Sequence, residues 1–146
     1  MTLRSLQTLG DPTKIVLNLF DLINETRDSN VMLDYLSDEL VYMNPVIGKT
    51  DKKGIQGFHA MLFSAFPDIH YQLDRLIVHG ETAVIECTVT GTQKGDFAGL
   101  PPSEKEIKLP LAFIIDFENG RAKNLELVFR QRDDDAPAWI REVIQS

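Results

Sequence analysis

Residues 71–92 read YQLDRLIVHGETAVIECTVTGT, and the rest of the predicted fold is arranged around this stretch. From Ile69 the period changes from helical to strand-like, which predicts a strand over Tyr71–His79; along Thr82–Thr92 the residues divide between two faces with a period of two, as in a strand with one buried face. Gly80 and Glu81, which separate the two runs, are a tight-turn signal. The sequence therefore predicts an antiparallel hairpin over these residues.

Two more strands are predicted after this hairpin. Glu106–Phe117 alternates strongly, and Arg121–Gln131 alternates again after a short polar break. The break contains Asn119 and Gly120, a pair that strongly favours a two-residue hairpin turn. Pro110 has no backbone N–H, so its position inside the first run predicts an edge strand or a bulge.

Helical patterns dominate the sequence before residue 70. Asp11 is a good N-cap, Pro12 suits the first helical position, and the apolar spacing that follows predicts a helix ending near Arg27. The other predicted elements are a short helix over residues 32–39, a strand over 40–44, a third helix over 55–66 ended by Pro67, and an amphipathic tail helix around Trp139, Ile140 and Val143.

This order of elements predicts an α+β fold, with three N-terminal helices packed on one face of a curved antiparallel sheet. A sheet closed over by helices encloses an apolar interior, which is a natural pocket for a small molecule. The 146 residues suffice for one ordinary domain, and we expect a single domain over residues 1–146.

Composition narrows the classes of partner and compartment. Lys and Arg number 15 against 22 Asp and Glu, a net charge of −7 that argues against nucleic-acid binding. Residues 1–11 lack a signal-peptide pattern, and no apolar run approaches the ~20 residues of a membrane helix. One cysteine, Cys87, and three scattered histidines predict no disulfide framework and no metal site. We expect a soluble cytoplasmic protein.

Four segments resemble the SnoaL-like polyketide cyclase family of the NTF2-like superfold. They are residues 48–58, Ala65–Asp68 (AFPD), Thr90–Ser103 (TGTQKGDFAGLPPS) and Glu118–Arg121 (ENGR). The resemblance runs from the first helix to Phe129. It implies an NTF2-like (cystatin-like) cone, usually a homodimer, that holds a small apolar molecule and needs no metal or cofactor.

The resemblance also implies where acid–base residues would lie. The cyclases use a pocket Asp near the end of the last strand and a His in a Thr-Gly-Thr-His stretch. In this sequence Gln93 occupies the His position, and the Asp position falls at or next to Arg130. An arginine cannot take a proton at neutral pH, because its pKa lies above ~12. Both members of the family's usual pair are therefore replaced.

The last predicted strand has two faces, and either could line the pocket. In the family orientation Asn124, Glu126 and Arg130 point inward, so that Glu126 would be a general acid or base and Arg130 would hold an anion. The opposite parity places Leu127 and Phe129 inside, and Glu126 and Arg130 then form ordinary salt bridges. We take Glu126 and Arg130 as the candidate catalytic residues.

Other residues are candidates for ligand binding. Tyr42 and Asn44 share one side of their short strand, where a phenol and an amide can orient a carbonyl; alternatively, Asn44 only shapes the turn before Pro45. The remaining candidates are His59 and Phe66 on the third helix, Thr90 and Gln93 at the end of the hairpin, and Phe97 in a loop at the pocket mouth.

Two functions remain open from the sequence. The first is an enzyme performing cofactor-free acid–base chemistry, of aldol or isomerase type, on a small apolar carbonyl compound. The second is a non-catalytic module that binds a hydrophobic ligand or a second subunit. Under both we expect a homodimer formed by the outer face of the four-stranded sheet.

Overall fold

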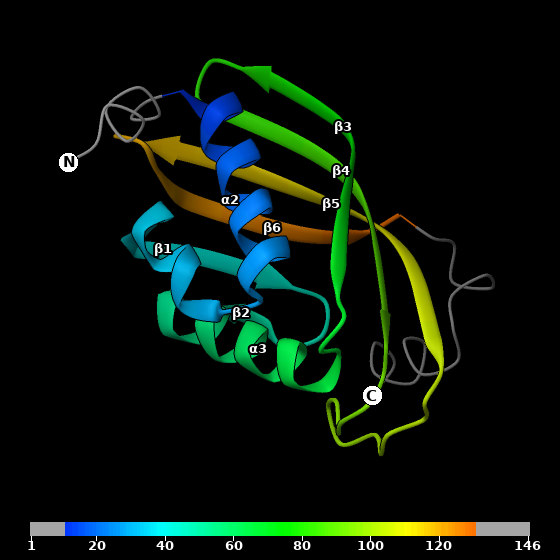
Figure 1. The fold of residues 1–146 in the computed structure, drawn as a ribbon. Helices are drawn as coiled ribbons and strands as arrows, with labels where there is room; N and C mark the ends of the chain where they lie inside the picture. The colour runs from blue at the N-terminus through cyan, green and yellow to red at the C-terminus, as the bar shows by residue number, and fades with distance from the viewer. Residues whose placement is uncertain (1–10, 131–146) are drawn as a thin grey trace.

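The computed structural model describes residues 11–130, and the predicted tail helix around Trp139 lies outside them. The elements, in chain order, are α2 (Pro12–Thr26), the 3-10 helix η1 (Ser29–Tyr35), β1 (Leu36–Asn44), β2 (Gly48–Thr50), α3 (Lys52–Ala65), β3 (His70–His79), β4 (Thr82–Thr92), β5 (Glu106–Glu118) and β6 (Arg121–Phe129) (Figure 1).

The six strands form one curved sheet in the order β2-β1-β6-β5-β4-β3. Strands β3 to β6 pair antiparallel with their sequence neighbours, as predicted. Strand β1 pairs with β6 in parallel, so the sheet is mixed and the expectation of a purely antiparallel sheet is wrong at this end. The parallel pair arises because β1 precedes the hairpins in sequence but lies next to the last strand in space.

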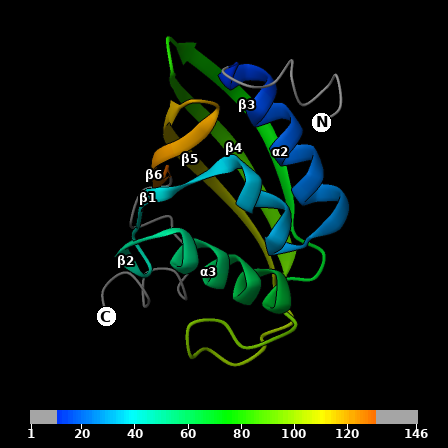
Figure 2. The same ribbon diagram turned by 90° about the vertical axis from the view of Figure 1, so that its left-hand side faces the viewer.

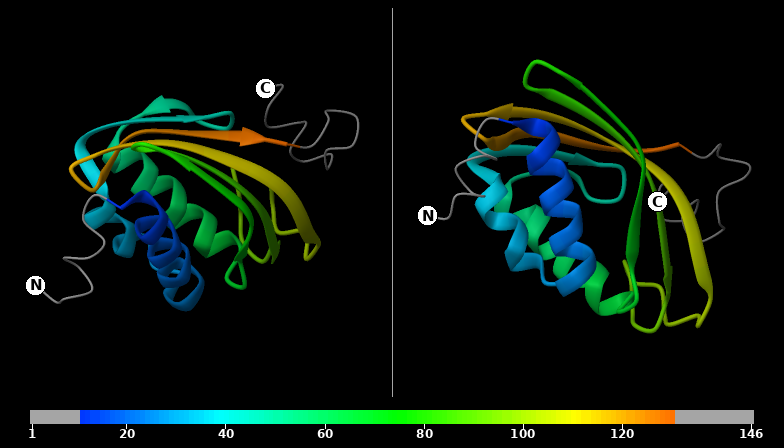
Figure 3. Two further views of the ribbon diagram at one scale, coloured as in Figure 1. Left: turned by 90° about the horizontal axis from the view of Figure 1, so that it is seen from above. Right: turned by 45° about the horizontal axis from the view of Figure 1, so that its top comes forward.

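All three helices cover one face of the sheet, and the other face is left uncovered within residues 11–130. Figure 2 shows α2 and α3 on the same side of the strands, and the view from above in Figure 3 shows the sheet curving over them. The predicted α+β class is therefore confirmed. Buried side chains from the helices and from the inner sheet face form one continuous core.

Side-chain caps begin both α-helices: α2 starts where the sequence predicts, and α3 starts at Lys52, three residues before the predicted start at Ile55. The Asp11 carboxylate accepts a hydrogen bond from the backbone N–H of Thr13 at 3.1 Å, which starts α2. Asp51 accepts from the backbone N–H of Gly54 at 2.9 Å and starts α3 in the same way. Gly54 is required there, since a Cβ atom would come within 1.9 Å of the Thr50 hydroxyl oxygen.

Helix α2 also covers the exposed edge of the sheet at β3. The Asn24 side chain accepts from the backbone N–H of Tyr71 at 2.8 Å and donates to its carbonyl at 2.9 Å. Arg27 donates to the carbonyl of Ile69 at 2.7 Å. Edge strands present unpaired backbone groups, and here two side chains of one helix satisfy several of them.

Three local predictions differ from the structure. The second helix is a 3-10 helix and ends early, so β1 begins at Leu36 instead of Leu40. The short strand β2 was not expected. Pro110 lies in regular pairing in β5, an interior strand, so the predicted edge position or bulge is wrong; β6 ends at Phe129, opposite Leu111, and the next N–H, that of Arg130, donates to the Pro110 carbonyl at 3.0 Å.

No helix among residues 11–130 combines the length and the apolar character needed to cross a membrane.

Candidate functional site

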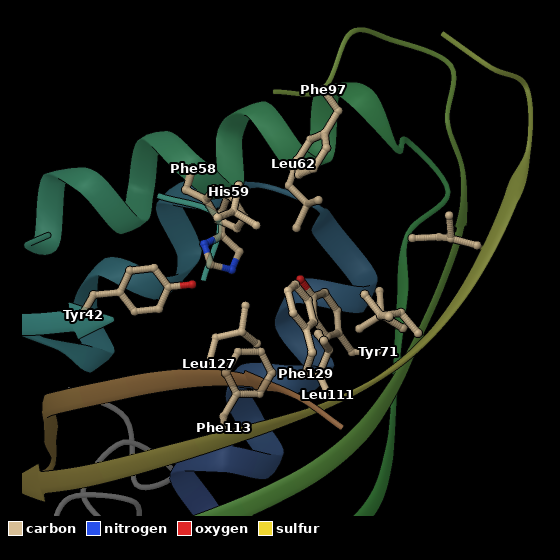
Figure 4. A pocket seen from close by; sticks show the side chains of 14 residues that line it. Tyr42, Phe58, His59, Leu62, Tyr71, Phe97, Leu111, Phe113, Leu127 and Phe129 are labelled. Atoms are coloured by element: carbon tan, nitrogen blue, oxygen red, sulfur yellow. The ribbon is translucent and has the colours of Figure 1, made fainter. Parts of the chain in front are cut away.

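A cavity lies between α3 and the concave face of the sheet (Figure 4). Nearly all of its surface is apolar, and its volume is about 50 Å³. Its lining residues are Tyr42, Val46, Phe58, His59, Leu62, Tyr71, Val89, Phe97, Ile107, Leu109, Leu111, Phe113, Leu127 and Phe129.

A second cavity, of about 40 Å³, lies between α2 and the same sheet. Its walls are apolar, with contributions from α2, η1, α3 and the strands. His59, Tyr71 and Phe113 line both cavities and therefore stand between them. We call the first the outer cavity and the second the inner cavity.

His59 is a buried, neutral imidazole. Its Nδ1 lies 2.9 Å from the carbonyl oxygen of Ile55, one turn earlier in α3. A carbonyl only accepts hydrogen bonds, so Nδ1 carries the hydrogen and Nε2 keeps its lone pair. Burial lowers the pKa of His59 to about 4, opposed by the hydrogen bond to Ile55. At neutral pH the side chain is therefore an uncharged acceptor at the cavity wall.

Tyr42 is fully buried on β1, and Asn44 holds its hydroxyl group. The backbone N–H of Val46 donates to Asn44 Oδ1 at 2.7 Å, so Asn44 Nδ2 is the atom that donates to the Tyr42 oxygen, also at 2.7 Å. Asn44 therefore shapes the turn around Pro45, as one sequence interpretation predicts, and its amide binds the Tyr42 phenol; it does not line either cavity. The Tyr42 oxygen accepts this bond, and its own hydrogen stays available to a ligand.

The rings of Tyr42 and His59 have centroids 6.5 Å apart, and the Tyr42 hydroxyl points toward the imidazole (Figure 4). Burial raises the pKa of Tyr42 above its ordinary value, an effect that the Asn44 hydrogen bond partly opposes. The phenol thus remains protonated and donates. One wall of the cavity therefore presents an oxygen donor beside a nitrogen acceptor.

Tyr71 is a polar lining residue that the sequence analysis did not select. Its ring rises from β3, and the ring centroid lies 5.9 Å from that of Phe20 and 6.5 Å from that of Phe113. Its hydroxyl group points into the cavity (Figure 4). The pattern of β3 placed it on the apolar face, which indicates packing and gives no signal for the phenolic oxygen.

Among the described residues, no charged side chain lines either cavity: the two linings contain no Asp, Glu, Lys or Arg. Nor does any group of three His, Cys, Asp or Glu side chains within residues 11–130 come together in the arrangement of metal ligands. The polar chemistry available in the cavities is that of two phenols and one imidazole.

The candidate catalytic residues of the last strand lie on the opposite face. Leu125, Leu127 and Phe129 point toward the helices, whereas Asn124 is exposed and Glu126 is half-buried on the outer side of the sheet. The inward orientation predicted for Asn124, Glu126 and Arg130 is therefore wrong. The physical reason is hydrophobic, because the alternate residues of β6 bury more apolar surface in the core.

Arg130 belongs to an ion-pair cluster on this outer face. Its guanidinium lies 3.1 Å from one carboxylate oxygen of Glu86, and Arg75 binds the other oxygen. Thr90, another candidate, also faces outward and lines a shallow polar groove between Asp68 and Lys108. Neither Arg130 nor Thr90 lines the two cavities.

Gln93 is buried and holds the loop that follows β4. Its amide nitrogen donates to the carbonyls of Gly95, Leu100 and Pro101 at 3.1, 3.3 and 3.1 Å, and its amide oxygen accepts from the Ser103 hydroxyl at 2.9 Å. These contacts use the donors and acceptors of the side chain within the loop. Gln93 is thus a loop-anchoring residue, and it does not line either cavity.

The same loop places Phe97 against the outer cavity. Phe97 packs on Phe58 and Phe66, with centroids 6.1 and 5.6 Å away, and it lines the cavity as predicted. Phe66 lies behind it and does not reach the lining. Gly95 lets the loop approach closely, since its backbone packs on Ala65 at the end of α3.

Cys87 is buried on the inner side of β4, as its alternation with apolar residues predicts. Burial raises the pKa of its thiol to about 12, so a thiolate is not populated at neutral pH. Cys87 therefore acts as a small apolar core residue.

Comparison with known proteins identifies the family. The sequence model of the SnoaL-like polyketide cyclase family matches residues 14–128. AclR from Streptomyces galilaeus superposes with a TM-score of 0.73 at 18% identity, covering 85% of this chain and 92% of AclR. A SnoaL-like polyketide cyclase from Agrobacterium tumefaciens superposes with a TM-score of 0.68 at 16% identity, covering 82% and 91%.

A third solved structure is similar to this chain in fold. A protein from Catenulispora acidiphila with a ketosteroid isomerase-like fold superposes with a TM-score of 0.66 at 17% identity, covering 79% of this chain and 84% of that one. At such identities the likeness concerns the fold. No curated protein sequence matches the chain.

Proposed function

This chain belongs to the SnoaL-like polyketide cyclase family, and we propose that it performs cofactor-free proton transfer on a small, neutral carbonyl compound held in the outer cavity. One observation carries the proposal: a buried, uncharged His59 directs a free Nε2 lone pair into an apolar cavity, beside the Tyr42 hydroxyl. Glu126, our candidate from the sequence, has no part in it.

The proposed step moves one proton. His59 Nε2 takes a proton from the carbon next to the ligand carbonyl, and the electron pair of that C–H bond moves toward the carbonyl oxygen to give an enolate. The Tyr42 O–H donates a hydrogen bond to this oxygen, on which negative charge develops. The imidazolium then returns the proton to the ligand, and the enzyme is regenerated unchanged.

Two features support this assignment. The Ile55 carbonyl fixes the tautomer of His59, and Asn44 fixes the Tyr42 hydroxyl, so both groups are oriented before a ligand arrives. The apolar walls exclude water, which strengthens hydrogen bonds to developing charge. Since no charged side chain among residues 11–130 lines either cavity, the proposed ligand is neutral in the resting complex.

Exchange of the methyl protons of acetophenone in D2O, followed by proton NMR, tests the proposal. We expect exchange above the buffer rate, a loss of 100-fold or more in His59→Gln, on the order of a general base's contribution, and a loss of about tenfold or more in Tyr42→Phe. His79→Gln and Tyr35→Phe are the matched controls. Exchange that is unaffected by His59→Gln contradicts the proposal.

The apolar lining also favours the second candidate, a non-catalytic module that binds a hydrophobic ligand. The same experiment separates the two functions. Binding of acetophenone without any exchange above background, in the unmodified protein, supports the module and removes the acid–base role of His59.

We also propose a homodimer through the outer face of the sheet. Four large apolar side chains, Met43, Ile77, Ile114 and Val128, are 37–50% exposed, and three of them lie on or next to β6. Burying these side chains against a second copy would remove them from water. Light scattering at micromolar concentration should give twice the chain mass, and a monomer mass contradicts the proposal.

A further inference from the structure

The backbone and the ring of Tyr71 both have partners in the fold, but its hydroxyl group has no hydrogen-bond partner among the described residues. The Asn24 side chain bonds both backbone polar groups of Tyr71, at 2.8 and 2.9 Å. Phe20 and Phe113 pack against the ring. Among residues 11–130, no group hydrogen-bonds to the phenolic oxygen, although the side chain is only 6% exposed.

Packing alone does not account for the hydroxyl. A phenylalanine would make the same ring contacts with Phe20 and Phe113, and it would avoid the free-energy cost of burying a polar group without a partner. Buried hydroxyls in proteins almost always have a partner, so an exception at a cavity wall needs its own explanation. The Tyr71 oxygen points into the cavity, where a ligand can supply that partner (Figure 4).

The protonation state of Tyr71 defines what the partner must be. Burial raises the pKa of the phenol above its ordinary value, and the proximity of Tyr42 and Cys87 raises it further. Tyr71 therefore keeps its hydrogen and is a neutral donor. The matching ligand group is a neutral oxygen acceptor, such as a carbonyl, ether or hydroxyl oxygen.

We infer that Tyr71 is a ligand-binding residue that donates a hydrogen bond to a second oxygen of the ligand, at the junction of the two cavities. The inference rests on the proposed function only for the position of the first oxygen, at Tyr42 and His59. Tyr71 rises from β3, whereas Tyr42 comes from β1, and strands β6, β5 and β4 lie between the two in the sheet order. The ligand class is therefore a small apolar compound with two separated neutral oxygen functions.

Three probes of similar size test this second contact: acetophenone, 3-hydroxyacetophenone and 4-hydroxyacetophenone, which place a second oxygen at two different separations. Binding is measured by calorimetric titration. We expect at least one hydroxylated probe to bind about three- to tenfold more tightly than acetophenone, the range of one net hydrogen bond. Tyr71→Phe should remove this gain and change acetophenone binding less than twofold. Tyr35→Phe, at a half-buried position outside both linings, is the matched control.

A thermal unfolding measurement on the ligand-free variants gives an independent readout. Tyr71→Phe should leave the midpoint Tm unchanged or raise it, because an unpartnered buried hydroxyl is removed. A structural role for the hydroxyl predicts the opposite, a Tm lowered by several degrees. A lower Tm in Tyr71→Phe overturns the inference.

The binding results distinguish a failure of the Tyr71 inference from a failure of the proposed acid–base function. The inference is overturned if no hydroxylated probe binds better than acetophenone, if the gain persists in Tyr71→Phe, or if Tyr71→Phe weakens all three probes equally. Failure of proton exchange in the presence of a Tyr71-dependent gain overturns the proposed acid–base function alone. No binding by any of the three probes overturns both.

Discussion

The two faces of the sheet use polar groups in opposite ways. On the outer face, charged side chains form ion pairs: the Glu86 carboxylate binds both Arg75 and Arg130. On the inner face the polar groups are few, uncharged and only partly satisfied: His59 keeps a free lone pair and Tyr71 a free hydroxyl within the described residues. Residual hydrogen-bonding capacity therefore lies inside the cavities and charge lies outside.

This contrast explains why the prediction of an inward-facing carboxylate on the last strand is wrong. Charged groups cost free energy in an apolar cavity unless they are paired, so the protein keeps them on the solvent side. Neutral phenols and imidazoles cost less and still donate or accept one hydrogen bond. A chain without the family's usual acid–base pair can thus retain a polar site, provided that the site is neutral.

Introducing a charge on the inner face should produce the largest effect. Leu127 is 7% exposed and lines the outer cavity, so Leu127→Asp removes apolar burial and buries a carboxylate. We expect a loss of about 5 kcal/mol in the free energy of unfolding, measured by urea denaturation. The same substitution at Val128, which faces outward, should cost about 1 kcal/mol or less when both variants are measured at a protein concentration at which light scattering shows a monomer. Equal losses at both positions would break the distinction between the faces.

Lowering the pH protonates His59 and so places a positive charge on the inner face. The folded protein holds the pKa of His59 at about 4, below its ordinary value of 6.5, so between these pH values the unfolded chain binds a proton that the folded chain does not. Stability is therefore fully present above pH 6.5 and falls as the pH drops toward 4, by about 3 kcal/mol in total.

Urea denaturation at pH 7 and pH 4.5 measures this loss. His59→Gln should reduce the pH dependence by most of that amount, whereas His79→Gln, at an exposed position, should leave it unchanged. The difference between the two variants isolates His59 from carboxylates that titrate in the same range. An equal pH dependence in both variants would show that His59 is not held neutral by burial.

Local sequence signals sufficed for most of the fold. The Asp11 cap, the Gly80 and Asn119-Gly120 turns and the alternation of β4 and β5 each act within a few residues, and each element appears where predicted. The parallel pairing of β1 with β6 was missed, since it joins segments about 80 residues apart and leaves no periodic signature.

The site was less predictable because it depends on the direction of single side chains. Tyr42, His59 and Phe97 were correctly selected as lining residues. The inward face of β6 was assigned by family orientation, against the apolar alternation that the core follows. Tyr71 was missed because a tyrosine in an apolar alternation has the same pattern whether or not its hydroxyl has a partner.

Releasing the loop after β4 should have an intermediate effect. Gln93→Leu keeps side-chain volume but removes the bonds to three carbonyls and to the Ser103 hydroxyl. We expect about 2 kcal/mol lower stability and faster trypsin cleavage after Lys94. Ser103→Ala, which removes one of these bonds, should show a smaller change in both. If Gln93→Leu weakens acetophenone binding but leaves cleavage unchanged, Gln93 contacts the ligand after all.

The smallest effect is expected at Glu126, our catalytic candidate from the sequence. Its half-buried side chain lies on the outer face, next to the exposed side chains of Met43 and Ile114. His59 lies on the opposite side of the sheet. Glu126→Gln should therefore change the free energy of unfolding by less than about 0.5 kcal/mol, as is usual for surface positions. Acetophenone exchange should stay within a factor of two, because the carboxylate cannot reach a ligand on the other face. A large loss of exchange with unchanged stability would mean that the catalytic charge acts from outside the cavity, and the contrast between a neutral inner face and a charged outer face would no longer describe how this protein works.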